Sequence, residues 1–272
     1  MTLYILIITS CITCLLFVPL VEDLLTGGNV LKENYKGKLI PAGMGIIIIP
    51  VLLINTILMM IIQPNTKEGL LIFLVGSFVM GFSGIIDDIV GNHSSRGLKG
   101  HLNSLLKGKL TTGGLKAITG VLIAIIIGLF NNLSLLDMMV NTIIITLMTN
   151  LLNLFDLRPG RCLKVFLLIS TITIPFGLNQ TSRSVIFILV GFSIIYIRDD
   201  LKARSMLGDV GSNILGINLG IAFALSFSFY MKLFISTVLI ALHLISEKTS
   251  FSKIINGNNT LNYLDELGRD KG

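Results

Sequence analysis

The sequence is short of charge, and this shortage limits the class of protein that it can form. Only 13% of its 272 residues are charged, whereas 53% are hydrophobic and the mean hydropathy is +0.86. An ordinary soluble domain carries about 25% charged residues, so a soluble protein is excluded. The composition predicts an all-α, polytopic membrane protein in which residues 1–272 form a single integral membrane domain.

Cysteine is also scarce, and the three present do not form a recognisable site. Cys11 and Cys14 fall inside the first apolar run and Cys162 falls in a predicted loop, with no second CxxC to complete a metal site. Packing explains all three. The chain also lacks a soluble module, an aromatic stacking platform and a groove-reading element, so its net charge of +6 does not indicate a nucleic-acid partner.

Apolar runs of about 20 residues, each long enough to cross roughly 30 Å of hydrocarbon, recur along almost the whole chain. The first has no basic residue before it and no cleavage site after it, which predicts a retained helix rather than a signal peptide. The sixth and seventh are short enough to tilt little or to be partly re-entrant. The predicted spans number nine and lie near residues 3–20, 44–62, 70–87, 113–130, 135–155, 163–178, 184–198, 213–230 and 233–246.

Basic residues divide sharply between alternate loops. One set of loops contains only Lys67, Arg183 and Lys232, and the other set, together with the carboxyl-terminal tail, contains all the remaining lysines and arginines. The positive-inside rule therefore predicts an amino terminus outside and a cytoplasmic carboxyl terminus in the cell membrane. The concentration of basic residues on the predicted cytoplasmic side has two explanations, attraction to anionic lipid headgroups or binding of an anionic substrate.

Asp87 and Asp88 close the third predicted span. A carboxylate at the centre of a bilayer costs roughly 2.5 to 3.5 kcal/mol on insertion scales, so this pair is expected near an interface or in a wet cavity. Adjacent helical residues point about 100° apart. One carboxylate can therefore face a cavity while the other reaches a metal or a second substrate. The alternative is a solvated interfacial pair.

The fifth predicted span ends in a polar ridge formed by Asn150, Asn153 and Asp156. A spacing of three places these side chains along one helix face, which is expected to contact protein or water rather than lipid. Arg158 and Arg161 follow and can bind phosphate bidentately. The alternative is an interhelical polar contact of the kind that holds membrane bundles together.

A glycine-rich loop, residues 206–213, precedes the eighth predicted span. Its glycines permit close backbone approach, and the amides of the helix start attract phosphate oxygens. Asp209 is placed to bind Mg²⁺, which is usually shared between one or two carboxylates and substrate phosphates. A helix cap is compatible with this role. The basic loops add Lys36, Lys99 and His101 as candidate substrate-binding residues.

Three stretches in this order carry a family resemblance: GIIDDIVGN followed by GLKGH, then NLLNLFDLRPGR, then MLGDVGSNILG. The chain resembles the polyprenyl-phosphate N-acetylhexosamine-1-phosphate transferases, which include phospho-MurNAc-pentapeptide translocase and the GlcNAc-1-phosphate transferases. The resemblance runs from Asn34 to the end. The family's second aspartate in the middle motif is replaced here by Pro159, and the aromatic residue often found before the Gly-Asp pair is replaced by Met206.

The resemblance implies transfer of a sugar 1-phosphate from a UDP-sugar to a polyprenyl phosphate, with Mg²⁺ as cofactor and release of UMP. It implies that Asp87 and Asp88 are catalytic, that Asp88 and Asp209 bind the metal, and that Asn153 and Asp156 shape the nucleotide side. It leaves room for a homodimer. Two other functions stay open, a transporter or lipid-handling protein and an inactive scaffold of the same family.

Overall fold

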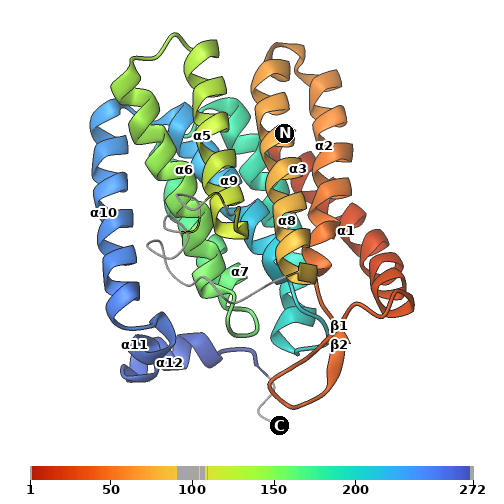
Figure 1. Cartoon of the computed structure of the whole chain (residues 1–272). Coiled ribbons are helices and arrows are strands. Elements are labelled where there is room, and N and C mark those ends of the chain that lie inside the picture. Colours follow the sequence, from red (N-terminus) through yellow and green to blue (C-terminus); the bar gives the residue numbers. More distant parts are fainter. Residues whose placement is uncertain (1, 91–103, 105–107, 109, 270–272) are drawn as a thin grey trace.

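Helices make up most of the part of the chain that this computed structural model describes, residues 2–90, 104, 108 and 110–269 (Figure 1). Two short helices follow the last long one, α11 (Phe251–Asn256) and α12 (Asn259–Glu266). The long helices are α1 (Thr2–Gly27), α2 (Ile48–Ile62), α3 (Lys67–Val90), α5 (Thr112–Phe130), α6 (Leu135–Phe155), α7 (Arg161–Thr173), α8 (Gln180–Leu201), α9 (Gly208–Ser226) and α10 (Phe229–Lys248).

Seven segments of the described chain are long and apolar enough to cross a membrane, which confirms an all-α polytopic protein. The number of spans and their orientation stay predictions. α7 and α8, the counterparts of the sixth and seventh predicted spans, are not among the seven. α7 has 13 residues, which extend about 20 Å at 1.5 Å per residue. The seven are Thr2–Gly27, Met44–Ile62, Pro64–Asp88, Thr112–Phe130, Leu135–Phe155, Gly208–Ser226 and Phe229–Lys248.

Several predicted boundaries were wrong, and two of them concern the polar motifs. α3 continues past Asp87 to Val90, so both aspartates lie inside its last turns. α9 begins at Gly208 rather than near residue 213, because Gly208 adopts a φ of +76° that turns the chain into the helix. Most of the predicted glycine-rich loop is therefore helical. Cys162, predicted in a loop, is buried in the first turn of α7.

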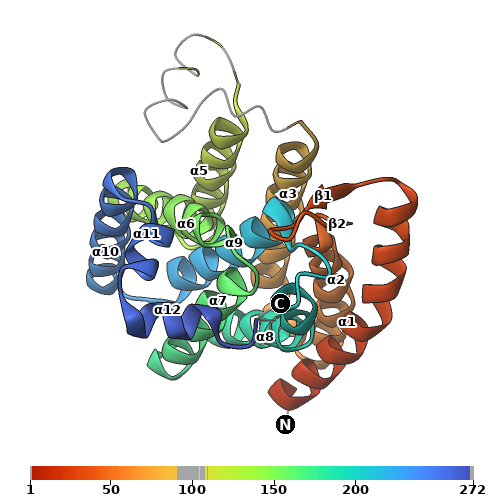
Figure 2. The same cartoon turned by 90° about the horizontal axis from the view of Figure 1, so that it is seen from below.

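α9 runs through the middle of the bundle (Figure 2). In the most apolar 18-residue stretch of α9, 83% of the residues are buried inside the protein, compared with 22% in that of α10. α9 approaches α6 closely through Gly216 and Gly220, where an added Cβ would lie 2.5 Å from the Cα of Thr149 and 2.7 Å from the Cα of Ile145. Small residues spaced by four are a common means of packing helices tightly in membranes, so α9 is a fixed centre against which the other helices are placed.

A two-stranded hairpin joins the chain after α1 to the start of α9. Its antiparallel strands are β1 (Leu31–Glu33) and β2 (Leu39–Pro41). The Met206 N–H donates to the Pro41 carbonyl at 2.8 Å, and the Gly45 N–H donates to the Leu207 carbonyl at 2.8 Å. These bonds fix the hairpin beside the loop that leads into α9.

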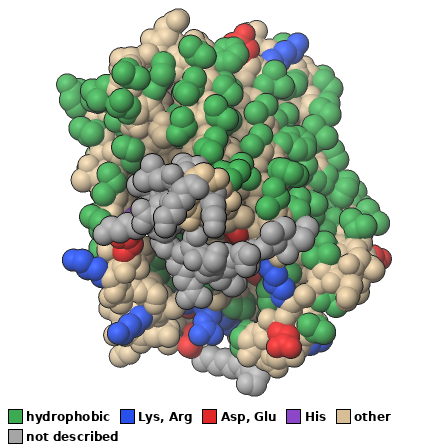
Figure 3. All heavy atoms as spheres, viewed as in Figure 1, with side chains coloured by type: hydrophobic (Ala, Val, Ile, Leu, Met, Phe, Trp, Pro, Cys, Tyr) green, Lys and Arg blue, Asp and Glu red, His purple; other side chains and the backbone are tan. Residues whose placement is uncertain are grey.

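The surface separates into apolar and charged parts. Figure 3 shows hydrophobic side chains over most of the upper part of one face, while most of its Lys, Arg, Asp and Glu side chains lie near the lower end. Large apolar side chains are exposed along the spans, including Phe82 at 61%, Leu129 at 69% and Phe234 at 65%. Such side chains are stable in contact with lipid, so this belt is consistent with a multi-pass membrane protein.

Candidate active site

Two aspartates from different helices meet at a lysine. Asp87 lies near the end of α3, Asp209 lies in the first turn of α9, and Lys116 lies in the first turns of α5. The Lys116 Nζ donates to Asp87 Oδ2 at 2.8 Å and to Asp209 Oδ2 at 3.2 Å. The two carboxyl groups also lie within hydrogen-bonding reach of each other. Like charges this close repel, and the ammonium group between them offsets that repulsion.

The close approach of α3 to α9 depends on Gly84. A Cβ at this position would lie 2.5 Å from the Cα of Val210, so only glycine allows the two backbones to touch. Asp87 is three residues further along α3, on the same helix face as Gly84. Asp209 follows the positive end of the α9 dipole, where a carboxylate is favoured. The sequence therefore places both acids at the contact point.

Asp88 is held differently from Asp87. Its Oδ1 accepts from the Lys32 Nζ of β1 at 2.9 Å, and its Oδ2 accepts from the Val210 N–H at 3.4 Å. A Cβ at Gly208 would lie 2.8 Å from this Oδ2, so the carboxylate is fitted against the loop backbone. Asp88 thus ties the hairpin to the start of α9. Asp87 rather than Asp88 is the partner of Asp209, whereas the sequence paired Asp88 with Asp209 at the metal.

The structure brings Asn153 to the same place. Its Nδ2 donates to Asp209 Oδ2 at 3.3 Å and to Asn213 Oδ1 at 3.3 Å. The amide of Asn213 is fully buried and its Nδ2 has no partner in the described residues. We refer to Asp87, Asp88, Asp209, Lys116 and Asn153 together as the acidic cluster.

Asp156 caps the end of α6 and binds the backbone that leads into α9. Its carboxylate accepts from the Gly208 N–H. Burial raises the pKa of Asp156 well above its ordinary value, and repulsion from Asp200, Asp209 and Asp88 raises it further. Asp200 at the end of α8 accepts from the Gly160 N–H at 2.8 Å and from the Leu207 N–H. Both acids therefore hold loops in place.

The remaining predicted residues do not lie in the acidic cluster. Arg161 is buried, and its guanidinium donates to both carboxylate oxygens of Asp265, at 2.8 and 2.7 Å. Arg158 is exposed and lines a different cavity. Lys36 is exposed at the hairpin turn, with its Nζ 5.6 Å from the centroid of the Tyr35 ring. Lys99 and His101 lie outside the described residues.

Sequence reasoning missed three residues that contact the acids. Lys116 and Lys32 were counted only as basic loop residues, although each forms an ion pair with an aspartate of the cluster. Thr112, the first residue of α5, forms a side-chain hydrogen bond to Asp87. A lysine at the start of an apolar helix was a usable signal for Lys116, because such a buried charge needs an acidic partner.

The acidic cluster offers carboxylate ligands of the kind that Mg²⁺ prefers. No group of three or more His, Cys, Asp or Glu side chains in the described parts of the chain is arranged to hold a metal ion. Asp87 and Asp209 do supply two neighbouring carboxylates, and the Lys116 ammonium lies where a cation between them would lie. Mg²⁺ commonly takes one or two carboxylates and completes its shell with water and phosphates. The residues therefore fit a magnesium ion that is bound together with a phosphate substrate.

Comparison with known proteins adds no relative. No protein-family model matches the chain, and no curated protein matches it. Its function must therefore be argued from the chemistry of the acidic cluster.

Proposed function

We propose that the protein transfers a sugar 1-phosphate, N-acetylhexosamine 1-phosphate, from a UDP-sugar to a polyprenyl phosphate, with release of UMP. The observation that carries the proposal is the meeting of Asp87 and Asp209 at Lys116, where α3 ends and α5 and α9 begin. These acids belong to two of the motifs that resemble the transferase family, and Asn153 comes from the third. Motifs far apart in sequence thus converge on one site.

The proposed reaction joins two phosphates. An oxygen of the polyprenyl phosphate forms a bond to the phosphorus that carries the sugar, and the bond from this phosphorus to the bridging oxygen breaks. UMP leaves with that oxygen and its electron pair. Because the reacting groups are both anionic, positioning and charge neutralisation supply most of the rate in such transfers.

Residues of the acidic cluster have distinct proposed roles. Asp87 and Asp209 would hold Mg²⁺ with the substrate phosphates, and the ion would neutralise charge between them. Lys116 keeps the two carboxylates together and can donate to a phosphate oxygen. Asn153 orients Asp209 through its amide. Asp88 is a positioning residue, because its contacts go to Lys32 and to the backbone of α9.

The surroundings of the acidic cluster suit a lipid acceptor. Phe82 and Phe78 on α3 are exposed at 61% and 43%, and they lie on the same helix as Asp87. A polyprenyl chain in the bilayer can pack along this apolar helix while its phosphate reaches the acids at the helix end. The proposal locates the cluster on the cytoplasmic face of the cell membrane, where the basic loops are expected.

The decisive experiment measures UMP release. The purified full chain is supplied with Mg²⁺, undecaprenyl phosphate and a panel of UDP-N-acetylhexosamines. Asp209→Asn should lower release strongly, whereas Asp199→Asn, at an acid that pairs with Arg204 outside the cluster, should leave it unchanged. Failure of the folded wild-type chain to release UMP from any donor, beside an active control enzyme, would contradict the proposal. Substrate movement across vesicles without chemical turnover would instead indicate a transporter.

A further inference from the structure

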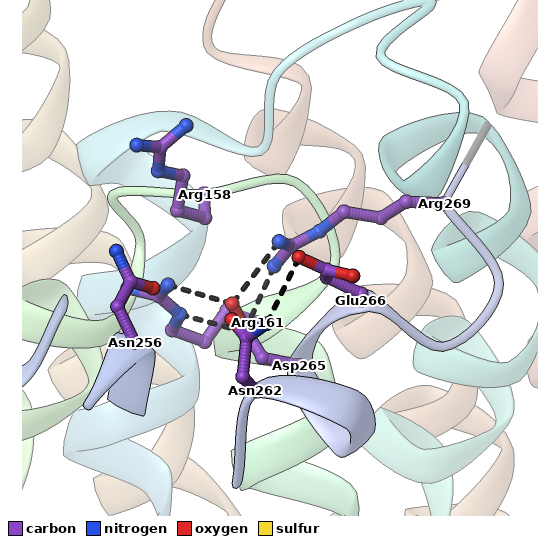
Figure 4. Close-up of a pocket in the computed structure, with 7 residues that line it drawn as sticks. All are labelled: Arg158, Arg161, Asn256, Asn262, Asp265, Glu266 and Arg269. Carbon is purple, nitrogen blue, oxygen red and sulfur yellow. Dashed lines mark hydrogen bonds and ion pairs between the residues drawn. The ribbon is translucent and has the colours of Figure 1, made fainter. Parts of the chain in front are cut away.

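A polar cavity of about 330 Å³ lies between the α6–α7 loop and the two C-terminal helices. Three arginines line it, Arg158, Arg161 and Arg269, and the other lining residues come from α11 and α12 (Figure 4). No residue of the acidic cluster belongs to the lining. We call this space the arginine cavity. Its volume is within the range of small-molecule pockets, roughly 300 to 1,000 Å³.

Two of the three arginines are already paired. Arg161 and Arg269 each donate two hydrogen bonds to the carboxylate of Asp265, at distances from 2.7 to 3.0 Å. Arg161 also donates to the Ser252 hydroxyl at 2.8 Å, and Arg269 donates to the Pro159 carbonyl at 2.8 Å. Asp265 therefore receives four charge-assisted bonds, which leave it no capacity for a third guanidinium.

Arg158 has no ion pair within the described parts of the chain, and Figure 4 shows its guanidinium standing apart from the network around Asp265. Glu266, the second carboxylate in the lining, accepts instead from the Asn262 amide at 3.1 Å. Among the described lining residues, three arginines against two carboxylates leave one excess positive charge. A cavity of this kind is complementary to an anion.

The chemistry of the lining identifies the kind of anion. Guanidinium groups bind phosphate in a planar, two-point geometry, and the neutral amides of Asn256 and Asn262 can bind hydroxyl groups beside it. We propose that the arginine cavity binds a phosphate group through Arg158. This binding site is separate from the acidic cluster, and the proposal goes beyond the transferase function without depending on it.

The phosphate can come from two sources. One is the headgroup of an anionic phospholipid, because basic pockets between helices at a membrane surface bind such headgroups. The other is a soluble phosphate compound. The arginine cavity lies at the end of the bundle where α7 begins and α10 ends (Figure 1), which is accessible to both.

The test uses the purified full chain in a zwitterionic detergent. Inorganic phosphate is titrated by calorimetry, and retained phosphatidylglycerol is compared with phosphatidylcholine by native mass spectrometry. Arg158→Gln should weaken binding by about tenfold or more, because a charged hydrogen-bond donor is lost. Arg158→Lys, which keeps the charge but not the planar fork, should weaken it less. Lys253→Gln on α11 removes a nearby exposed charge outside the cavity and should leave binding unchanged.

Each outcome decides the proposal. Loss of inorganic phosphate binding in Arg158→Gln supports it with a soluble ligand, and selective loss of phosphatidylglycerol supports it with a lipid headgroup. Equal binding by the wild-type chain and Arg158→Gln overturns it, as does an absence of binding to the wild-type chain. Binding that is lost in Asp209→Asn but kept in Arg158→Gln belongs to the acidic cluster and also overturns it. UMP release is measured separately, so failure of the transferase proposal is distinguishable.

Discussion

The acidic cluster and the network around Asp265 lie at the same end of the bundle, and they balance their charges in opposite ways. In the cluster, Lys116 is shared by two carboxylates whose side chains are 20% and 29% exposed. Around Asp265, one carboxylate that is 6% exposed is shared by two arginines. Where carboxylates outnumber the cations that pair with them and are partly exposed to solvent, they can bind a metal ion or a substrate. A saturated, buried acid instead holds two helices together.

The difference also shows that a charged motif residue is not by itself a substrate ligand. Arg161 follows the polar ridge of α6 directly, yet its guanidinium is fully occupied by residues about a hundred positions later in the chain. Breaking a buried pair leaves an uncompensated charge, so substitution of such a residue lowers the stability of the fold. Mutations at the two places should therefore separate activity from folding.

The largest effect is expected at Asp87. Asp87→Asn removes one of two carboxylates proposed to face the phosphates, so UMP release should fall about 10³-fold, the upper end for loss of one preorganised electrostatic group. The thermal midpoint should change little, because Lys116 keeps its contact with Asp209. Initial rates and unfolding curves of the purified variant measure both. A fall in activity of less than tenfold would show that Asp87 does not take part in the chemical step.

The second effect is on stability. Asp265→Ala leaves Arg161 buried without its partner and should cost about 3 kcal/mol. Glu266→Ala is the matched control, since this neighbouring carboxylate is exposed and bonds only to Asn262 among the described residues. Chemical denaturation followed by circular dichroism compares the two. Equal stability of both variants would show that the network does not hold α12 in place.

The third effect is a pH dependence of the stability that the contacts of Asp265 with Arg161 and Arg269 provide. Burial alone raises the pKa of Asp265, but hydrogen bonds from Arg161 and Arg269 outweigh it and lower the pKa below its ordinary value. Because the pKa of Asp265 is lower in the folded state than in the unfolded state, its contacts stabilise the fold fully at pH values above the unfolded-state pKa, about 3.9. This stabilisation is lost as the pH falls through the folded-state pKa. α12 should therefore detach only in acid, below about pH 4.

Tryptophan emission can follow this detachment, because the chain contains no tryptophan. Tyr263→Trp reports on α12, and Leu244→Trp on α10 reports whether the long helices stay folded. Emission from position 263 should change in acid before emission from position 244. In an Asp265→Asn background it should already be shifted at pH 7. Simultaneous change at both positions would mean that the network has no separate titration.

The smallest effect is expected at Lys32. Its side chain is 47% exposed, and exposed ion pairs contribute about 0 to 1 kcal/mol. Lys32→Gln should therefore lower kcat/KM for UMP release by no more than about fivefold. Lys116→Gln, at a lysine that is 13% exposed and shared by two acids, should lower it far more. If Lys32→Gln lowered kcat/KM as much as Asp87→Asn does, Asp88 would be a catalytic residue rather than a positioning residue.

Local sequence signals were sufficient for the membrane class and pointed to part of the acidic cluster. Long apolar runs set the spans, and acids or amides at their ends marked Asp87, Asn153 and Asp209. These local signals did not predict which side chains each of these residues contacts. Which of two adjacent aspartates meets Asp209 depends on the rotation of α3 against α9, and this rotation is set by the contact of Gly84 with Val210. Lys32 and Lys36 were indistinguishable before the hairpin register was known.

The sequence by itself determined a polytopic, all-α membrane protein whose polar motifs stand at helix ends, because hydrocarbon excludes charge and sets the length of each apolar run. Only the tertiary structure decided how those motifs are used. It paired Asp87 with Asp209 across Lys116, and it assigned Arg161 to Asp265, 104 residues later. Such pairings depend on distances between helices, which small residues at their crossing points control and local sequence does not encode.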